Sequence, residues 1–97
     1  MKYKVRFGLS FHKDVVSMTD YLEDYPEKAE RILSQLDRVA SMLTNMPELY
    51  PVYDILPIFR KIAIEDYLVF YTVDKLHHIV SIYRLLYGGM DIPAQLK

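Results

Sequence analysis

Two arginines in segments rich in strand-forming residues are the strongest candidates for chemistry in this 97-residue chain. Arg60 and Arg84 lie in the apolar runs 58–64 and 79–87, whose Ile, Val, Tyr and Phe residues favour strands of one sheet. If the two side chains share a face of that sheet, their guanidinium groups can hold one phosphate. Lys61 must face the opposite side of the strand from Arg60 and therefore competes with it for such a site. The alternative role for each arginine is a solvated strand residue or a contact with a protein partner.

The remaining residue types and their spacing argue against most common metal-binding and catalytic sites. Cysteine is absent, so disulfides, thiolate metal sites and a cysteine nucleophile are excluded. His77 and His78 are adjacent, and neighbouring strand residues face opposite ways, so the pair is poorly placed to chelate one ion. No glycine-rich phosphate loop, zinc-ligand spacing or Ser/His/Asp arrangement is present, and we expect neither a metal nor a cofactor. The acids best fit a solvated helical face: Asp20, Glu23, Asp24, Glu27 and Glu30.

The charge balance gives no general attraction to nucleic acid. The chain has 12 Lys and Arg against 13 Asp and Glu, for a formal net charge of -1, so any contact with RNA or DNA needs a local basic patch. A hydrophobic content of 52% argues against disorder. No apolar run approaches the roughly 18 residues of a membrane span, and the first residues lack the apolar part of a signal peptide. We therefore expect one domain over residues 1–97, in the cytoplasm and without membrane contact.

The first half of the chain predicts a strand followed by two helices. Residues 2–7 alternate between charged and apolar side chains, as in a half-buried strand. Ser10 is a plausible N-cap for a first helix over 11–25. Pro26 breaks that helix and restarts another, in which apolar residues recur with helical spacing up to Leu43.

The second half of the chain predicts a sheet. An irregular connection over 46–57, marked by three prolines, leads into strands 58–64, 67–73 and 79–87 joined by short turns. Gly88 and Gly89 are expected to supply a turn with unusual φ and ψ, and residues 92–96 a single helical turn. Three consecutive strands favour an antiparallel meander to which the first strand adds, with the helical hairpin covering one face. The predicted fold class is therefore α+β, a two-layer sandwich.

This order of elements, together with local strings, resembles the RelE/ParE superfamily of bacterial type II toxins. The strings that carry the resemblance include 26–29, 47–48, 67–74 and 82–91, and they cover nearly the whole chain. The resemblance implies a RelE-like fold and a toxin held inactive by a cognate antitoxin. Some members of the superfamily are ribosome-dependent endoribonucleases that cut messenger RNA, and others poison DNA gyrase.

The resemblance also implies roles for the basic residues. RNA cleavage by attack of the 2′-hydroxyl needs a proton acceptor, a cation for the developing charge and a proton donor. At the matching positions, Arg60 and Arg84 would hold the phosphate, and Tyr87 would act at the leaving group or stack on a base. Lys61 would bind the RNA. The leading expectation is thus a metal-independent endoribonuclease that acts on ribosome-bound messenger RNA.

Two departures from the pattern of the nuclease members favour other functions. Met90 stands where related sequences often carry arginine, and Leu68 where some carry a basic residue. Each change removes positive charge from the expected site. The alternatives are a non-enzymatic inhibitor of DNA gyrase and a degenerate toxin that only binds its antitoxin.

Tyrosine content predicts a protein interface. The chain has nine tyrosines, a residue type enriched at binding surfaces, and a core this small does not need all of them. Tyr50, Tyr53 and Tyr83 are expected to line a groove for an antitoxin helix or an extended peptide, docked across the sheet or along its edge.

Overall fold

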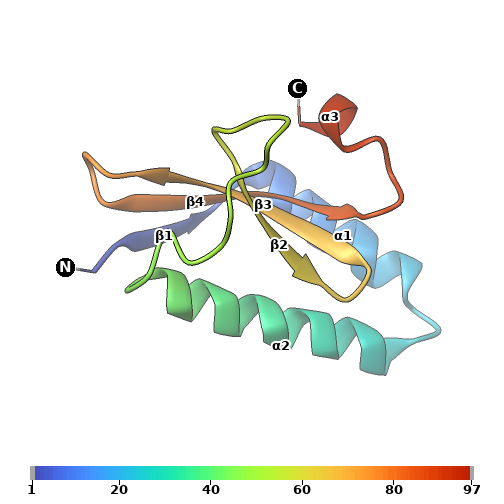
Figure 1. Cartoon of the computed structure of the whole chain (residues 1–97). Coiled ribbons are helices and arrows are strands. Elements are labelled where there is room, and N and C mark those ends of the chain that lie inside the picture. Colours follow the sequence, from blue (N-terminus) through green and yellow to red (C-terminus); the bar gives the residue numbers. More distant parts are fainter. Residues whose placement is uncertain (1, 97) are drawn as a thin grey trace.

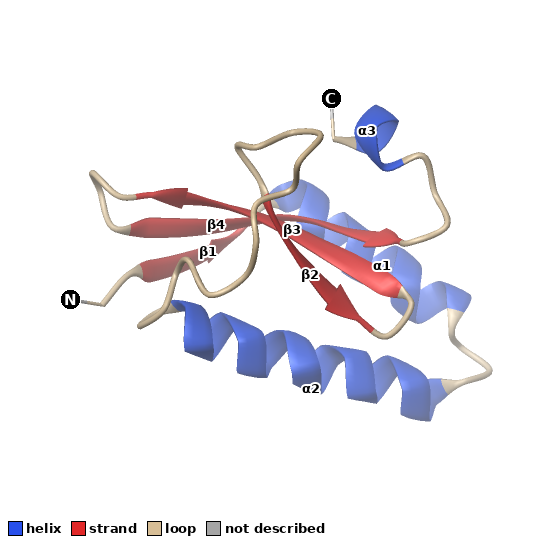
Figure 2. Ribbon diagram, in the orientation of Figure 1, coloured by secondary structure: helices blue, strands red, loops and turns tan. Residues whose placement is uncertain are grey.

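Four strands form one mixed sheet, and two long helices cover one of its faces (Figures 1 and 2). The computed structural model describes residues 2–96. The elements in chain order are β1 (Lys4–Phe7), α1 (Leu9–Tyr21), α2 (Pro26–Leu43), β2 (Arg60–Ile64), β3 (Tyr67–Asp74), β4 (Ile79–Tyr87) and α3 (Ile92–Gln95). The predicted α+β class and the predicted order of strands and helices are confirmed.

The strand order is β1-β4-β3-β2, so the first strand joins the C-terminal meander as predicted. β1 runs parallel to β4, whereas β4 and β2 run antiparallel to β3. β1 is short and pairs only with residues 79–82 of β4. The outer edge of β4 from Tyr83 to Tyr87 therefore has no neighbouring strand, and this open edge positions the site described below.

A β-bulge shifts the register of β4 against β3. Tyr71 pairs with Ile82, but the preceding residue, Phe70, pairs with Arg84, which leaves Tyr83 as the extra residue. A bulge of this kind changes which face each following side chain belongs to. Arg84 consequently lies in the cross-strand row of Phe70 rather than in that of Val69.

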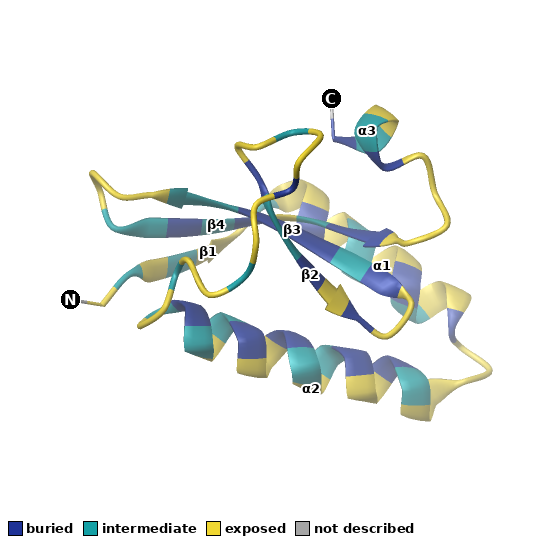
Figure 3. Cartoon of the chain, viewed as in Figure 1, coloured by how far each residue is buried: buried dark blue, intermediate teal, exposed yellow. Residues whose placement is uncertain are grey.

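The helices and the sheet enclose the main core. On α2 the buried residues form one stripe, visible as the repeated dark segments in Figure 3: Ala29, Ile32, Leu36, Val39 and Leu43. α1 starts earlier than predicted, with Gly8 as its N-cap, so Ser10 lies inside the helix and its predicted capping role was wrong. Gly8 directly follows β1, and its N–H donates to Ile82 O of β4 at 2.9 Å, so the helix begins immediately after this last bond to the sheet. Within residues 2–96, no helix combines the length and apolarity needed to cross a membrane.

The other face of the sheet is covered by the connection between α2 and β2 and by α3 (Figure 1). A second, smaller core forms there from Tyr53, Phe59, Phe70, Leu86, Ile92 and Leu96. The ring of Tyr53 meets that of Phe70 edge-on, with 5.2 Å between centroids. Both faces of β3 are thus buried, in line with the nearly continuous apolar sequence of this strand.

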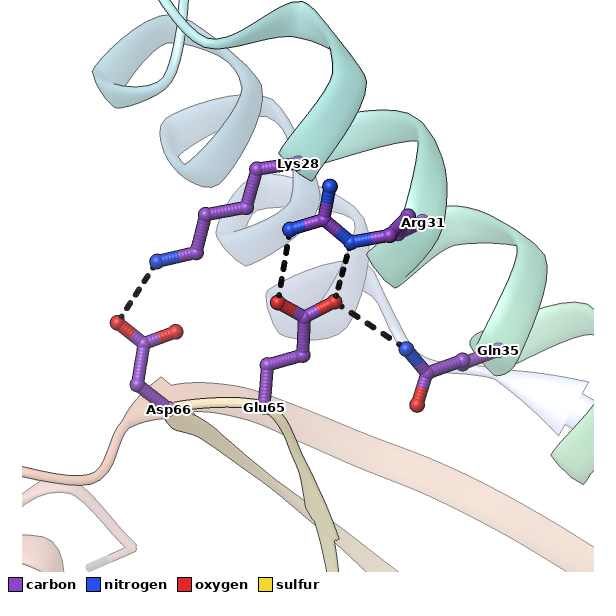
Figure 4. A network of polar contacts seen from close by, with 5 residues as sticks. All are labelled: Lys28, Arg31, Gln35, Glu65 and Asp66. Atoms are coloured by element: carbon purple, nitrogen blue, oxygen red, sulfur yellow. Dashed lines mark hydrogen bonds and ion pairs between the residues drawn. The ribbon is translucent and has the colours of Figure 1, made fainter.

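A polar network ties α2 to the turn between β2 and β3 (Figure 4). The carboxylate of Glu65 accepts two bonds from the guanidinium of Arg31, both of 3.2 Å, and one from the Gln35 amide. Asp66 pairs with Lys28 at 3.0 Å. These hydrogen bonds raise the pKa of both Arg31 and Lys28. The network connects α2 to the β2–β3 turn, where Glu65 has a left-handed backbone with a φ of 54°.

The two glycines after β4 differ from the expectation. Neither has a positive φ, so the predicted need for unusual dihedral angles was wrong. Gly89 instead lies close to the Tyr87 ring, and a Cβ there would lie 2.5 Å from Cε2 of Tyr87, so a side chain at this position would push the ring aside. The absent side chain leaves room for the Tyr87 ring, which borders the site described below.

Replacing Tyr71 by Phe tests the buried hydroxyl at the centre of the fold. Tyr71 is fully buried, and its hydroxyl donates to Pro47 O at 2.9 Å. We expect Tyr71→Phe to lower the free energy of unfolding at pH 7 by about 1 kcal/mol, measured by urea titration.

The same variant should also change the response to alkali. Burial raises the pKa of Tyr71 in the folded state, so its contribution to stability is present below the unfolded pKa of about 10 and is lost as the pH rises through the folded value. Tyr71→Phe should remove this part of the alkaline loss. Equal alkaline profiles for the wild type and Tyr71→Phe would contradict the assignment.

Candidate functional site

A groove runs between α1 and the C-terminal half of β4, and we call it the α1–β4 groove. Its volume is about 440 Å³. It brings together two of the predicted catalytic residues, Arg84 and Tyr87. The lining consists of Asp14, Ser17, Met18, Tyr21, Tyr67, Arg84, Leu85, Leu86, Tyr87 and Met90.

Arg84 is held by a nearly buried carboxylate at the base of this groove. Its Nε and Nη2 donate to Asp14 at 2.7 and 3.0 Å, and its Nη1 donates to Gln95 O at 2.7 Å. The side chains of Arg84 and Asp14 are only 19% and 14% exposed. The hydrogen bonds to Asp14 raise the pKa of Arg84. The groove therefore presents a neutralised ion pair rather than a free cation.

The open edge of β4 explains why a carboxylate is needed here. The amide of Leu85 points outward from the sheet beyond the end of β1, and it donates to Asp14 Oδ2 at 2.9 Å. A buried amide without a partner would cost free energy. Asp14 sits four residues before the buried Met18 on α1, so helix packing carries its carboxylate to the strand edge.

Arg60 lies apart from Arg84. It pairs with Tyr71, whereas Arg84 pairs with Phe70, and successive residues of β3 face opposite sides of the sheet. The guanidinium of Arg60 donates to Tyr50 O at 2.7 Å and pairs with Glu48 at 3.1 Å. The condition for a joint grip on one phosphate, a shared face, is not met. The catalytic role of Arg60 stays a prediction, and its observed contacts tie β2 to the preceding connection.

Lys61 shares a cross-strand row with Arg84 through Phe70. Its Nζ lies 5.5 Å from the centroid of the Tyr53 ring, within the range of a cation–π contact. Lys61, rather than Arg60, is thus the basic residue of β2 on the face of Arg84, and its RNA-binding role stays a prediction.

The three tyrosines expected at a partner groove have different environments. Tyr53 belongs to the second core, where its side chain is 9% exposed. Tyr50 is partly buried against the main core. Tyr83 is exposed, and its ring lies 5.2 Å from that of Phe59. Antitoxin contacts by these residues stay predictions.

Sequence reasoning missed the tyrosines that line the α1–β4 groove beside Tyr87. Tyr21 is 81% exposed, and Tyr67 is buried at the base. The sequence did offer one signal for Tyr21, because this tyrosine lies beside the apolar stripe of its helix and not within it. The role of Asp14 had no local signal, because 70 residues separate it from Arg84.

Within residues 2–96, none of the pKa values that are displaced from their ordinary values moves toward 7. Burial raises the pKa of the Tyr67 phenol at the groove, so Tyr67 keeps its proton and cannot act as a base at pH 7. The contact with His77 lowers the pKa of Asp74, far from the groove. The same part of the chain has no cluster of three or more acids or histidines that could hold a metal ion.

Removing the Asp14 carboxylate tests its structural role. Asp14→Ala leaves Arg84 unpaired and the Leu85 amide without an acceptor, so we expect a loss of about 3–5 kcal/mol in the free energy of unfolding. The double variant Asp14→Leu/Arg84→Met removes both charges and should be more stable than Asp14→Ala alone. Urea titration of the single and double variants measures both effects. A loss below about 1 kcal/mol for Asp14→Ala would contradict this role.

Three solved structures with a similar fold come from toxin-antitoxin systems. The structure of RelBE2 from Mycobacterium tuberculosis is 23% identical, with a TM-score of 0.65, and the match covers 90% of this chain and 99% of that one. The ParDE structure from Pseudomonas aeruginosa is 14% identical, with a TM-score of 0.71 and coverage of 89% and 96%. The archaeal RelE–RelB complex from Pyrococcus horikoshii is 20% identical, with a TM-score of 0.53 and coverage of 92% and 98%. These likenesses show a shared fold.

The sequence also matches a family model. A comparison with curated proteins gives no match. The model described as the ParE toxin of the type II toxin-antitoxin system parDE matches residues 5–92. Because this match spans most of the chain, from within β1 to the start of α3, the protein belongs to the ParE toxin family.

Proposed function

We propose that this toxin acts by binding, without an enzymatic step, and that its target is DNA gyrase, with a cognate antitoxin as its natural partner. The observation that carries the proposal is the state of the two arginines. Arg84 is neutralised by Asp14, and Arg60 is bound to Glu48 and lies on the other face of the sheet. A phosphoryl transition state needs free positive charge held close together.

The apolar lining of the α1–β4 groove also supports binding to a protein. Met90 borders the groove where a nuclease pattern would place arginine, and Tyr21 and Tyr87 present exposed aromatic surface beside it. Aromatic residues and methionine are typical of protein interfaces. The match to the ParE family model favours the gyrase-directed branch of the superfamily.

The first experiment measures whether DNA synthesis or protein synthesis stops first when the toxin is induced. We expect induction of the toxin alone to stop thymidine incorporation before methionine incorporation, and the purified toxin to inhibit supercoiling by DNA gyrase. Co-expression of the cognate antitoxin is the control and should restore both. If methionine incorporation stops first and primer extension finds cut messenger RNA, the gyrase proposal is wrong.

The second candidate function is the endoribonuclease, because Arg84 and Tyr87 do line one groove. In that case the Tyr87 hydroxyl would serve as a proton donor. Tyr87→Phe should then lower the rate of mRNA cleavage by about 10²–10⁴-fold, as measured in a translating extract. A matched Tyr25→Phe variant, altered at an exposed tyrosine outside the groove, should cleave at the wild-type rate.

A further inference from the structure

We propose that a row of basic and hydroxyl side chains on the uncovered end of the sheet binds the phosphate backbone of duplex DNA. We call this row the basic strip, and it consists of Lys4, Arg6, Thr72 and Ser81. In the target complex the DNA would be the segment held by gyrase, and this part of the inference rests on the proposed function. The toxin would thus contact both the enzyme and the DNA on which the enzyme acts.

The strip lies on the face of the sheet away from α1 and α2. Val5 of β1 packs against the main core, so its neighbours Lys4 and Arg6 face the opposite side. Arg6 is in register with Ser81, and Ser81 is in register with Thr72. The row therefore crosses β1, β4 and β3, which lie about 4.8 Å apart as neighbouring strands do.

This end of the sheet is uncovered. The connection between α2 and β2 and the short helix α3 lie over the second core, and Figure 1 shows β1 and the turn between β3 and β4 extending beyond that connection. Lys4 and Arg6 are exposed, while Thr72 and Ser81 are half-buried. Figure 3 shows these strand ends mostly in teal and yellow. A ligand can therefore reach both cations and both hydroxyl donors from one side.

The cations of the strip are free, in contrast to Arg60 and Arg84. Within residues 2–96, neither Lys4 nor Arg6 forms an ion pair, and residues 2–7 include three basic residues and no acid. Asp74 lies two strands from Lys4 in the same row, but its carboxylate is 2.8 Å from the His77 ring and accepts from the His77 backbone N–H. A phosphate can thus bind the strip without displacing a carboxylate.

A group of acids lies at the opposite end of the molecule. They follow one another along the end of α1 and the start of α2: Asp20, Glu23, Asp24, Glu27 and Glu30. Figure 1 shows the turn between these helices and the start of β1 at opposite ends of the chain, whose longest dimension is 42 Å. The net charge of -1 therefore hides an uneven distribution, which would turn the basic strip toward a polyanion and the acidic end away from it.

The arrangement of the strip fits the backbone of a duplex better than a small phosphate ligand or a single strand. Its side chains are spread along a sheet surface, and alternate residues of β1 are about 6.6 Å apart, so they offer separate contacts to successive phosphates. Single strands are held mainly by stacking of bases on aromatic rings. The strip itself contains no aromatic residue, and Tyr83, two residues beyond Ser81, already packs against Phe59 at 5.2 Å. Binding should therefore be independent of DNA sequence.

Fluorescence anisotropy with a labelled duplex tests the strip without gyrase. The double variant Lys4→Gln/Arg6→Gln should weaken binding at low salt at least about tenfold, and the slope of log K against log salt should fall by about 2. The matched control, Lys13→Gln/Arg38→Gln, makes the same change in net charge at exposed positions on α1 and α2. It should bind the duplex as the wild type does, and circular dichroism verifies that both double variants are folded.

The same variants in gyrase assays separate contact with DNA from contact with the enzyme. Lys4→Gln/Arg6→Gln should require at least about tenfold more toxin to inhibit supercoiling, and it should bind DNA-free gyrase with the wild-type affinity. Failure of the wild type to inhibit gyrase would refute the proposed function. The anisotropy would still decide whether the strip binds duplex DNA, so the two failures can be told apart.

Three results would overturn the proposal. The first is an equal duplex affinity and salt slope for the wild type and Lys4→Gln/Arg6→Gln, or an equal loss in both double variants. The second is a loss of affinity of Lys4→Gln/Arg6→Gln for DNA-free gyrase, which would assign these side chains to an acidic surface of the enzyme. The third is tighter binding of a single-stranded RNA of the same length, which would assign the strip to RNA.

Discussion

The carboxylate of Asp14 is the interaction on which this half of the molecule depends. It accepts two bonds from Arg84 and one from the amide of Leu85, and Arg84 in turn donates to the carbonyl of Gln95 in α3. One carboxylate thus links α1, the open edge of β4 and the C-terminal segment. Because the pair is nearly buried, removing either charge would leave the other without a partner and would lower the stability of the fold.

This link compensates for the short first strand. β1 covers only the first half of β4, and an uncovered strand edge in a protein exposes unpaired backbone groups that invite pairing with another chain. α1 covers part of the remaining edge and blocks the Leu85 amide through Asp14. The rest of this edge is bordered by the tyrosines of the α1–β4 groove. The molecule therefore limits where another chain can pair rather than closing the edge completely.

The fold could be predicted from local patterns, because each element has its own periodicity. The apolar stripe of α2 and the strand-forming runs of β3 and β4 are properties of neighbouring residues, and their positions agree with the structure. The placement of Arg60 and Arg84 could not be predicted in this way. Without the bulge at Tyr83, Arg84 would follow Ile82 on the face of Tyr71 and Arg60, and the shared-face condition would hold. The bulge adds one residue, which places Arg84 on the opposite face from Arg60. No clear sequence pattern marks the position of this bulge. Contacts between distant segments, such as that of Asp14 with Arg84, likewise cannot be predicted from the periodicity of neighbouring residues.

The contacts that Arg60 and Arg84 make within the fold conflict with a catalytic role for the same two side chains. For Arg84 to hold a phosphate through its bonded nitrogens, the phosphate would have to displace a nearly buried carboxylate and a carbonyl, which would then need new partners. Arg60 would likewise have to leave Glu48 and the Tyr50 carbonyl, and with them the tie between β2 and its preceding connection. A protein that binds its target through apolar and aromatic surface meets no such conflict, because the arginines keep their partners. The same residues that stabilise the strand edge thereby leave the α1–β4 groove neutral and suited to another polypeptide.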